Sequence, residues 1–279
     1  MSSTSASSAN AAAPAAHGGR VVQCVVPVAA PPSAVWQALT DPTELMRWFP
    51  IEASATPGPG GSVRLCWPGE HDATAAIEIW QPERHLRLVG FPSDGPRPLV
   101  TDYVLEGDGG RTVLRVVSSG FGQGDAWDEM FEGVRCGWAF ELRSLRHYLE
   151  RHRGTDRRTA WVRKDFTGSH AAAWDRLTGR GGWFGAAGLP ALAPGEPYAV
   201  RTAAGDILEG RAELWEPPRL VAGTVSGWND ALFRMELWGL GAQARVAFWL
   251  STYGMPQDEV DAIRRRWDAA LDQVLDNRS

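Results

Sequence analysis

Hydrophobic and polar positions alternate with a period of two in several short stretches of the first half of the chain. In residues 62–67 the alternation places Val63, Leu65 and Trp67 on one face. Such alternation is typical of β-strands that have one buried face. Turn-forming residues separate the stretches, and the polar segment 107–111 is typical of a hairpin loop. We therefore expect an antiparallel sheet, with strands near 21–28, 62–67, 74–80, 85–91, 99–107 and 112–121.

Two kinds of helix are expected beside these strands. A short helix near 31–39 is followed by a restart, with Asp41 as N-cap, Pro42 at the first helical position and Glu44 three residues after the cap. The last element is a long amphipathic helix of about six turns. Its apolar stripe comprises Trp127, Phe131, Val134, Trp138, Leu142, Leu145 and Leu149. A single helix lying across a curved sheet covers it without filling it, which predicts an interior cavity.

The second half of the chain repeats short patterns of the first half in the same order. Segment AVWQALT (34–40) corresponds to AAWDRLT (172–178), and the pair Trp48–Phe49 corresponds to Trp183–Phe184. The offset falls slowly, from 138 residues at the first match to 129 at the last, as small loop deletions would produce. The other matches are IWQPERHL with LWEPPRL, SGFG with STYG, and RCGWAFEL with RRRWDAAL. The set predicts tandem copies of one domain of about 120 to 130 residues.

Each copy is expected to contain a first strand, two short helices, five or six antiparallel strands and a long helix. In the second copy, Gly179 and Arg180 replace the Asp41–Pro42 cap. The charge-rich stretch 151–159 is typical of a boundary between domains. We therefore predict a disordered tail at 1–19, a first domain at 20–152, a linker at 153–159 and a more divergent second domain at 160–277.

Composition argues against several classes of protein. The formal net charge of the 279 residues is −5, whereas a nucleic-acid-binding protein more often has a basic face. The three cysteines have no CxxC spacing, which argues against a disulfide framework or a zinc site and fits a reducing cytoplasm. No apolar run is long enough to cross a bilayer, and the N-terminus lacks the pattern of a signal peptide. We therefore expect a cytoplasmic protein with no membrane span and no nucleic-acid partner.

Four segments carry a family resemblance: AVWQALTDPTELMRWF, IWQPERHL, TVLRVVSSGF and RCGWAFELRSLRHYL. With the order of elements, they resemble the START-like, or SRPBCC, superfamily and its AHSA1-like branch (activator of Hsp90 ATPase homologue, C-terminal type). The resemblance covers residues 21–152 well and residues 159–277 less well. It implies an α+β fold of two tandem helix-grip (START/Bet v1-like) domains, each a curved antiparallel sheet wrapped around a long C-terminal helix. Members include ligand carriers, polyketide cyclases and co-chaperone modules, so the fold does not fix the function.

Aromatic side chains dominate the faces assigned to the cavity of the first domain. The resemblance places Trp48 and Phe49 where the short helices meet the open end of that cavity. The other candidates for ligand binding there are Trp67, Tyr103, Ser118, Phe121, Trp127, Phe131 and Trp138. The candidates in the second domain are Trp183, Phe184, Tyr253 and Trp267. For all of these aromatic residues, packing in an ordinary core is the alternative.

Candidates for catalysis are few. Glu141 borders the apolar stripe of the long helix, where desolvation would raise its pKa and suit it to general acid/base work; a solvated position is the alternative. Tyr103 is the second candidate, as a hydrogen-bond donor inside the cavity. The second copy has Ala270 where the first has Glu141, and His71 falls in a predicted hairpin loop and is assigned no role. Motifs for nucleotides, metals and activated nucleophiles are absent, so we expect no cofactor and no metal.

Three functions follow from these observations. The favoured hypothesis is a protein that binds an apolar or aromatic small molecule, chiefly in the first domain, because the cavity faces are aromatic and no catalytic set is recognisable. The alternative is an enzyme of the polyketide cyclase, aromatase or dehydratase type that uses the same cavity. The third is an interaction module like the co-chaperone of the branch, although no protein partner is indicated. The sequence leaves open whether there is catalysis, which ligand binds and how the domains pack.

Overall fold

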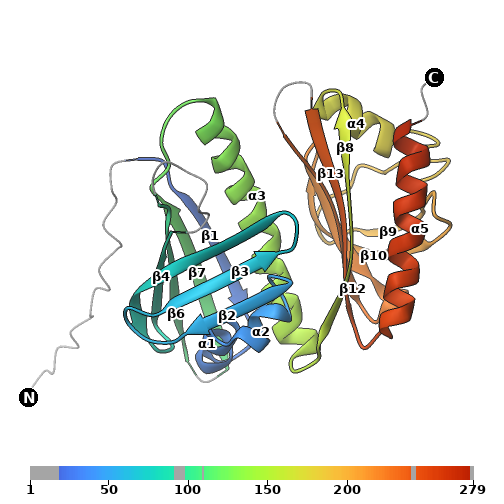
Figure 1. Cartoon of the computed structure of the whole chain (residues 1–279). Helices are drawn as coiled ribbons and strands as arrows, with labels where there is room; N and C mark the ends of the chain where they lie inside the picture. The colour runs from blue at the N-terminus through green and yellow to red at the C-terminus, as the bar shows by residue number, and fades with distance from the viewer. Residues whose placement is uncertain (1–18, 91–97, 109, 240–242, 277–279) are drawn as a thin grey trace, which may run out of the picture.

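The chain folds into two modules that each pack an antiparallel sheet against a long helix (Figure 1). The computed structural model describes residues 19–90, 98–108, 110–239 and 243–276. The tail predicted at 1–19 lies outside the described residues, apart from Gly19. The architecture confirms the tandem duplication that the sequence pattern predicted and the α+β helix-grip fold that the family resemblance implied.

The first module contains a seven-stranded sheet with the strand order β1-β7-β6-β5-β4-β3-β2. Two short helices follow the first strand, and the long helix α3 follows the last, as expected. One strand, β2, was not predicted. The elements are β1 (Val22–Val28), α1 (Pro32–Thr40), α2 (Pro42–Met46), β2 (Glu52–Thr56), β3 (Ser62–Trp67), β4 (His71–Gln81), β5 (His85–Val89), β6 (Val100–Asp108), β7 (Arg111–Ser119) and α3 (Asp125–His147), which continues as a π-helical turn at Tyr148–His152.

The second module contains a six-stranded sheet with the order β8-β13-β12-β11-β10-β9. Its elements are β8 (Arg157–Thr167), α4 (His170–Thr178), β9 (Pro197–Arg201), β10 (Ile207–Glu216), β11 (Leu220–Val225), a 3₁₀ turn at Ser226–Trp228, β12 (Ala231–Trp238), β13 (Gln243–Tyr253) and α5 (Gln257–Asp276). The expectation of two short helices in this copy is wrong. Residues 179–196 form turns and irregular structure, because no cap equivalent to Asp41–Pro42 restarts the chain after α4.

Local sequence signals account for the short helices. The Asp41 side chain accepts hydrogen bonds from the backbone N–H groups of Thr43 and Glu44, at 2.8 and 3.1 Å, which confirms the predicted N-cap. The two copies of the WxxLT pattern also make the same bond. Thr40 Oγ1 donates to the carbonyl of Trp36 at 2.7 Å, and Thr178 Oγ1 donates to the carbonyl of Trp174 at 2.8 Å.

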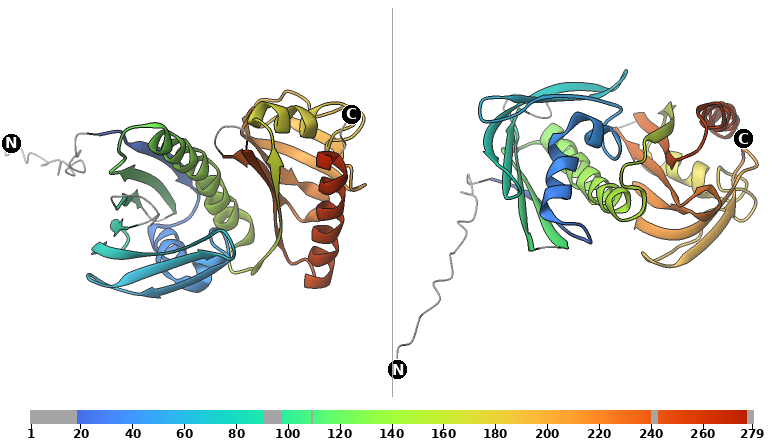
Figure 2. Two further views of the ribbon diagram at one scale, coloured as in Figure 1. Left: turned by 45° about the horizontal axis from the view of Figure 1, so that its top comes forward. Right: turned by 90° about the horizontal axis from the view of Figure 1, so that it is seen from below.

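The modules stack as four layers: first sheet, α3, second sheet and α5 (Figure 2). One side of α3 packs on the first sheet, whereas the opposite side places Phe140 against Leu214, Leu220 and Ala222 of the second sheet. The second sheet is therefore covered on both faces, by α3 and by α5. The nearly continuous burial of β12 and β13 is the consequence.

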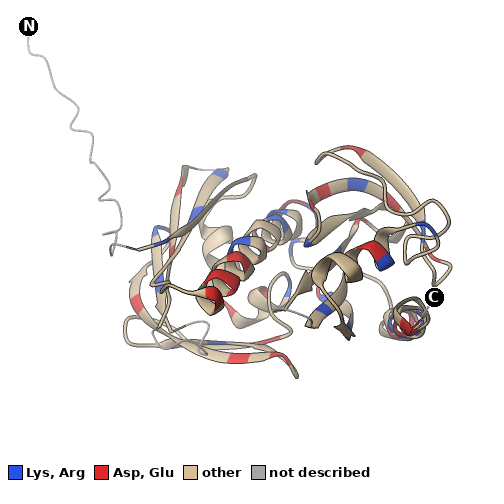
Figure 3. Ribbon diagram, turned by 90° about the horizontal axis from the view of Figure 1, so that it is seen from above, with Lys and Arg blue, Asp and Glu red and all other residues tan. Residues whose placement is uncertain are grey.

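Charged residues on α3 follow the helix dipole. Asp125 and Asp128 lie in its first turn, and Arg146 and His147 lie in its last turn. Figure 3 shows the acidic residues gathered toward one end of this helix and the basic residues toward the other. Among the described residues, no helix is long and apolar enough to span a bilayer.

Candidate functional site

A cavity of about 480 Å³ lies where the first module meets the outer face of the second sheet. Three surfaces line it: the inner face of the first sheet with the β3–β4 hairpin, one side of α3, and side chains of the second sheet that face away from its own core. This volume falls within the range of small-molecule sites, roughly 300–1,000 Å³. The cavity therefore extends beyond the space between one sheet and its helix that the sequence predicted.

The wall from the first module contains the aromatic rings of Phe49, Trp67 and Trp138. The ring of Phe49 lies 5.1 Å from that of Trp67 and 5.6 Å from that of Trp138, measured between centroids. Two hydroxyl groups lie beside these rings: Trp138 Nε1 donates to Ser118 Oγ at 2.9 Å, and Ser118 Oγ lies 3.2 Å from Thr101 Oγ1. Flat rings beside a few polar atoms suit an apolar or aromatic molecule.

Two glycines leave one side of α3 bare at the cavity. Gly133 and Gly137 are four residues apart, so they share one side of the helix, and Glu141 follows on the same side. A Cβ atom added to either glycine would meet no atom within 4 Å. A glycine inside a helix costs about 1 kcal/mol relative to alanine. The two glycines therefore lower the stability of α3 and leave open space at the cavity.

The second module supplies the facing wall. Arg234, Glu236 and Trp238 on β12 line the cavity, together with Trp249 on β13 and Trp161 on β8. Their side chains leave the second sheet on the face opposite to α5, because side chains alternate between the two faces of a strand. The rings of Trp161 and Trp249 lie 5.0 Å apart, and these two residues are direct partners in the β8–β13 ladder.

Ion pairs join the two modules around the cavity. The pair of Glu141 with Arg234 is buried, whereas the other two pairs are partly exposed and contribute less to stability. The contacts are Glu141 with Arg234 Nη1 at 3.0 Å, Glu129 with the guanidinium of Arg219 at 3.0 and 2.8 Å, and Glu70 with Arg163 Nη1 at 2.8 Å. These contacts hold both walls in a fixed relation.

Glu141 is buried at the cavity wall. Burial raises the pKa of Glu141 to about 7, against the opposing effect of the positive charges of Arg234 and Arg157. The expected rise is confirmed, and its cause is the desolvation predicted from the sequence. The carboxyl group of Glu141 can therefore gain or lose a proton near neutral pH. Its role in any reaction stays a prediction.

The structure brings four of the nine predicted ligand-binding residues of the first domain to this cavity. They are Phe49, Trp67, Ser118 and Trp138. His71 also lines the cavity, although it was assigned no role; it is the first residue of β4 and does not lie in a hairpin loop. The two aromatic residues that were predicted on opposite elements, Trp67 on β3 and Trp138 on α3, thus meet at one site.

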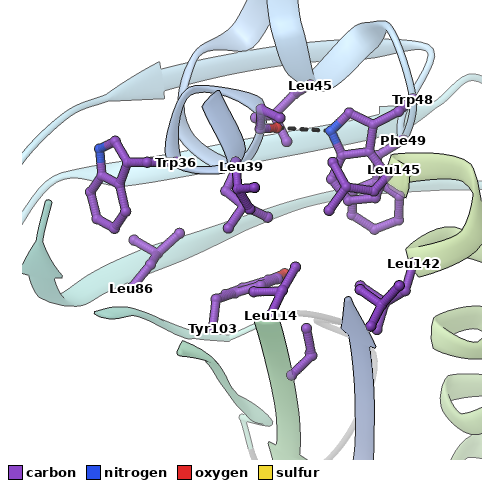
Figure 4. Packing of buried hydrophobic residues seen from close by; sticks show 14 of the residues in the cluster. Trp36, Leu39, Leu45, Trp48, Phe49, Leu86, Tyr103, Leu114, Leu142 and Leu145 are labelled. Carbon is purple, nitrogen blue, oxygen red and sulfur yellow. Dashed lines mark hydrogen bonds between the residues drawn. The ribbon is translucent and has the colours of Figure 1, made fainter. Parts of the chain in front are cut away.

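Trp48 and Tyr103 do not line the cavity, contrary to the prediction. Figure 4 shows both side chains among the buried hydrophobic residues of the first module. Trp48 is fully buried, stacks on Phe49 and donates its indole N–H to the carbonyl of Ala38 at 2.8 Å. Tyr103 lies in the aliphatic core with its ring edge-on to Trp138, and burial raises the pKa of its hydroxyl. A catalytic role for Tyr103 at this cavity is therefore not favoured.

Phe121, Trp127 and Phe131 also lie away from the cavity wall. Phe121 and Phe131 pack edge to face, with ring centroids 5.1 Å apart, and the guanidinium of Arg20 covers Phe131. The ring of Trp127 lies against Gly122. These side chains pack in the core beside the first turns of α3. Only part of the apolar stripe of this helix faces the cavity.

The interior of the second module is packed where the first module has space. Trp183 and Trp267 are fully buried and lie 5.7 Å apart, and both pack around Phe248. They belong to the hydrophobic core of the second module, which is the alternative that the sequence left open for them. Phe184 is also buried, but it borders a separate hollow of about 510 Å³ between the loop after α4 and strand β9.

Tyr253 does not lie inside the second module. Its side chain packs in the core cluster of the first module, its ring stacks on His152 at 4.2 Å, and its hydroxyl donates to the carbonyl of Arg47 at 2.9 Å. The matched segments SGFG and STYG differ at two positions, and the difference between Gly120 and Thr252 decides where the aromatic ring points. Gly120, at a φ of +99°, ends the strand and allows Phe121 to turn inward, whereas Thr252 continues β13 and leaves Tyr253 on the outer face.

Sequence reasoning missed the wall from the second module and the glycines of α3. Two signals could have found them. Residues 246–250 are continuously apolar, which is typical of a strand covered on both faces. Gly133 and Gly137 interrupt an amphipathic helix at a four-residue spacing, which indicates a place where something approaches the helix closely.

Comparison with known proteins places the first module in a family. Residues 29–150 match the family described as "Activator of Hsp90 ATPase homolog 1-like protein". No curated protein matches the chain with significant sequence similarity.

Among solved structures, the chain is similar to the Aha1 dimer from Colwellia psychrerythraea, with 19% identity over 49% of this chain and 100% of that one, and a TM-score of 0.44. It is also similar along most of its length to two further proteins. One is DynU16, a protein of the dynemicin biosynthetic locus, with 20% identity over 92% of this chain and 98% of that one, and a TM-score of 0.43. The other is the di-domain ARO/CYC BexL from the BE-7585A biosynthetic pathway, with 15% identity over 94% and 100%, and a TM-score of 0.44.

Proposed function

We propose that this protein, whose first module is an AHSA1-like domain of the SRPBCC superfamily, binds a small apolar or aromatic molecule in the cavity shared by its two modules. The observation that supports the proposal is the composition of the cavity wall. Aromatic rings from both modules surround a space of about 480 Å³, and two glycines keep the side of α3 free of side chains there. Burying apolar ligand surface against these rings is the expected source of affinity.

A substitution that fills the cavity tests the proposal. Gly137→Leu extends a side chain into open space without disturbing the core, since an added Cβ meets no atom within 4 Å. The probe is 2-naphthol, and binding is measured by the quenching of tryptophan fluorescence. We expect Gly137→Leu to weaken binding at least tenfold.

The matched control is Gly137→Ala. It removes the same helical glycine, which stabilises α3 by about 1 kcal/mol, and it leaves most of the cavity empty. This variant should bind the probe as the wild type does. Equal affinity of the wild type and of Gly137→Leu would place the bound probe elsewhere and contradict the proposal.

A second function, general acid/base catalysis on the bound molecule, is favoured by one observation. Glu141 lines the cavity, and burial raises its pKa to about 7, which suits proton transfer at neutral pH. An aryl methyl ketone such as 2-acetylnaphthalene provides a test, because its methyl protons exchange with solvent deuterium through the enol. The wild type should accelerate this exchange and Glu141→Gln should not; equal rates with both proteins would remove Glu141 from this role.

A further inference from the structure

Glu236 projects into the cavity from the second sheet. Its neighbours along β12, Met235 and Leu237, lie in the core of the second module, so Glu236 leaves the sheet on the opposite face. The residues beside it on the adjacent strands are Ala247 and Leu220, which carry no polar side-chain group. About a quarter of the Glu236 side chain is exposed, at 27%. The carboxylate therefore stands on an apolar part of the wall and is accessible from the cavity.

The other carboxylates of the cavity wall are already engaged. Glu141 accepts a hydrogen bond from Arg234, Glu129 accepts two from Arg219, and Glu70 accepts from Arg163. Within the described part of the chain, Glu236 is the cavity carboxylate that accepts no hydrogen bond.

The closest cation to Glu236 is Arg234, with Nη2 at 3.5 Å from Oε1. That guanidinium is held by Glu141 through its other terminal nitrogen, at 3.0 Å. A half-buried carboxylate keeps strong acceptor sites that are costly to leave unused once water is displaced. When an apolar ligand displaces water from this part of the wall, a donor on the ligand is the group that can satisfy Glu236.

We infer that Glu236 determines the specificity of the cavity, and that it selects aromatic molecules that carry a hydroxyl or N–H donor over those that do not. The inference rests on the proposed function and adds to it the chemical class of the ligand. The aromatic part of the ligand packs between the rings of the two walls, and its donor group points to β12. Discrimination comes from the carboxylate of Glu236, which an analogue without a donor leaves with no hydrogen bond once water is displaced.

Two probes of nearly the same size separate the contribution of the donor to binding from that of the aromatic ring. They are 2-naphthol, which has an O–H donor, and 2-methoxynaphthalene, which has none. Binding of each is measured by the quenching of tryptophan fluorescence. Because a hydrogen bond to a charged acceptor is worth more than a neutral one, the wild type should prefer 2-naphthol by about tenfold or more.

Variants at position 236 test the origin of this preference. Glu236→Gln keeps a neutral acceptor and should reduce the preference to about threefold, and Glu236→Leu should abolish it. Both should bind 2-methoxynaphthalene at least as well as the wild type does. The matched control is Glu209→Leu, which removes an exposed carboxylate from β10 of the same sheet and should leave the preference unchanged.

The outcomes separate this inference from the proposed function. If Gly137→Leu weakens both probes but Glu236→Leu leaves the preference intact, the cavity binds ligands and the role of Glu236 is wrong. If neither probe binds the wild type, or if Gly137→Leu affects neither, the proposed function fails and the inference fails with it. Far-UV circular dichroism of each variant shows that the fold is retained, and Glu236→Gln provides a second reading if Glu236→Leu does not fold.

Discussion

The two modules differ most clearly at one pair of facing residues on equivalent strands. In the first module, Thr101 on β6 stands opposite Ser118 on β7; in the second, Phe233 on β12 stands opposite Leu250 on β13. Two small hydroxyl residues leave space next to the long helix, and two large apolar residues fill it. One cross-strand pair thus distinguishes a copy with a cavity from a copy with a packed core.

The tryptophan of the long helix reports the same difference. Trp138 donates its indole N–H to Ser118 at the cavity wall, whereas Trp267 packs against the ring of Phe233, with centroids 5.8 Å apart. The second copy nevertheless contributes to the cavity through the outer face of its sheet. Duplication therefore gave one module whose inner face lines the cavity and one whose outer face closes it.

The largest expected difference between the two modules is in the free energy of unfolding that a core substitution costs. Phe233→Ala opens a void in the packed core of the second module, and we expect the free energy of unfolding to fall by about 3–5 kcal/mol. Ser118→Ala, at the position that corresponds to Leu250, removes only hydrogen bonds at a cavity wall and should cost about 1 kcal/mol. Urea denaturation of both variants measures the difference. Similar costs would show that the two interiors are packed alike.

The two modules should also differ in how their stability depends on pH, because Glu141 titrates in the first copy and Ala270 stands at its place in the second. Burial raises the pKa of Glu141 from 4.5 to about 7. The native state therefore keeps a proton that the unfolded state releases in this interval, so the stability due to the neutral carboxyl is present below pH 4.5 and is lost as the pH rises through about 7. Glu141→Gln does not titrate. Relative to the wild type, its free energy of unfolding should rise by about 3 kcal/mol between about pH 4.5 and pH 8.

Urea denaturation at the two pH values measures this change, and Glu209→Gln, at an exposed position of β10, is the control that should follow the wild type. A difference between Glu141→Gln and the wild type that does not vary with pH would mean that Arg234 keeps Glu141 ionised throughout the range.

Much of the fold follows from local sequence, and the first module shows why. The strands from residue 62 onward, the Asp41 cap and the stripe of α3 depend on neighbours in the chain, so periodicity and capping rules predict them. The strand Glu52–Thr56 was missed because it is a short edge strand with small side chains. The second module has no equivalent of the Asp41–Pro42 cap and forms only one short helix, so a single N-cap determines whether the second short helix forms.

The site was less predictable, because half of its wall depends on how the modules pack. Glu141 was identified from its place beside an apolar stripe, and Trp67 and Trp138 from their faces. Arg234 and Glu236 interrupt an apolar strand, but the local pattern does not show which element packs on that face. A charged residue on a two-sided buried strand is the sequence signal for such an interface.

A smaller effect tests why the strands end differently in the two modules. Gly120 has a φ of +99°, and a Cβ added there would lie 3.0 Å from the carbonyl oxygen of Pro98. Gly120→Ala should therefore cost about 2 kcal/mol of unfolding free energy. Gly58 has nearly the same φ, +97°, but open space around it, so Gly58→Ala carries the backbone strain alone and should cost less. If Gly120→Ala were neutral, the glycine would not be what ends β7 and turns Phe121 inward.

The smallest effect concerns the tryptophans of the repeated Trp–Phe pairs. Trp48 and Trp183 are both fully buried, but only Trp48 has a partner for its indole N–H, the carbonyl of Ala38 at 2.8 Å; within the described residues, Nε1 of Trp183 has none. Trp48→Phe loses packing and leaves a carbonyl unpaired, whereas Trp183→Phe loses similar packing and also removes a donor that was buried without a bond. Trp48→Phe should therefore cost about 1 kcal/mol more of unfolding free energy than Trp183→Phe. An equal or larger cost for Trp183→Phe, measured by urea denaturation, would mean that its indole N–H is satisfied and that the second core tolerates polar groups as well as the first does.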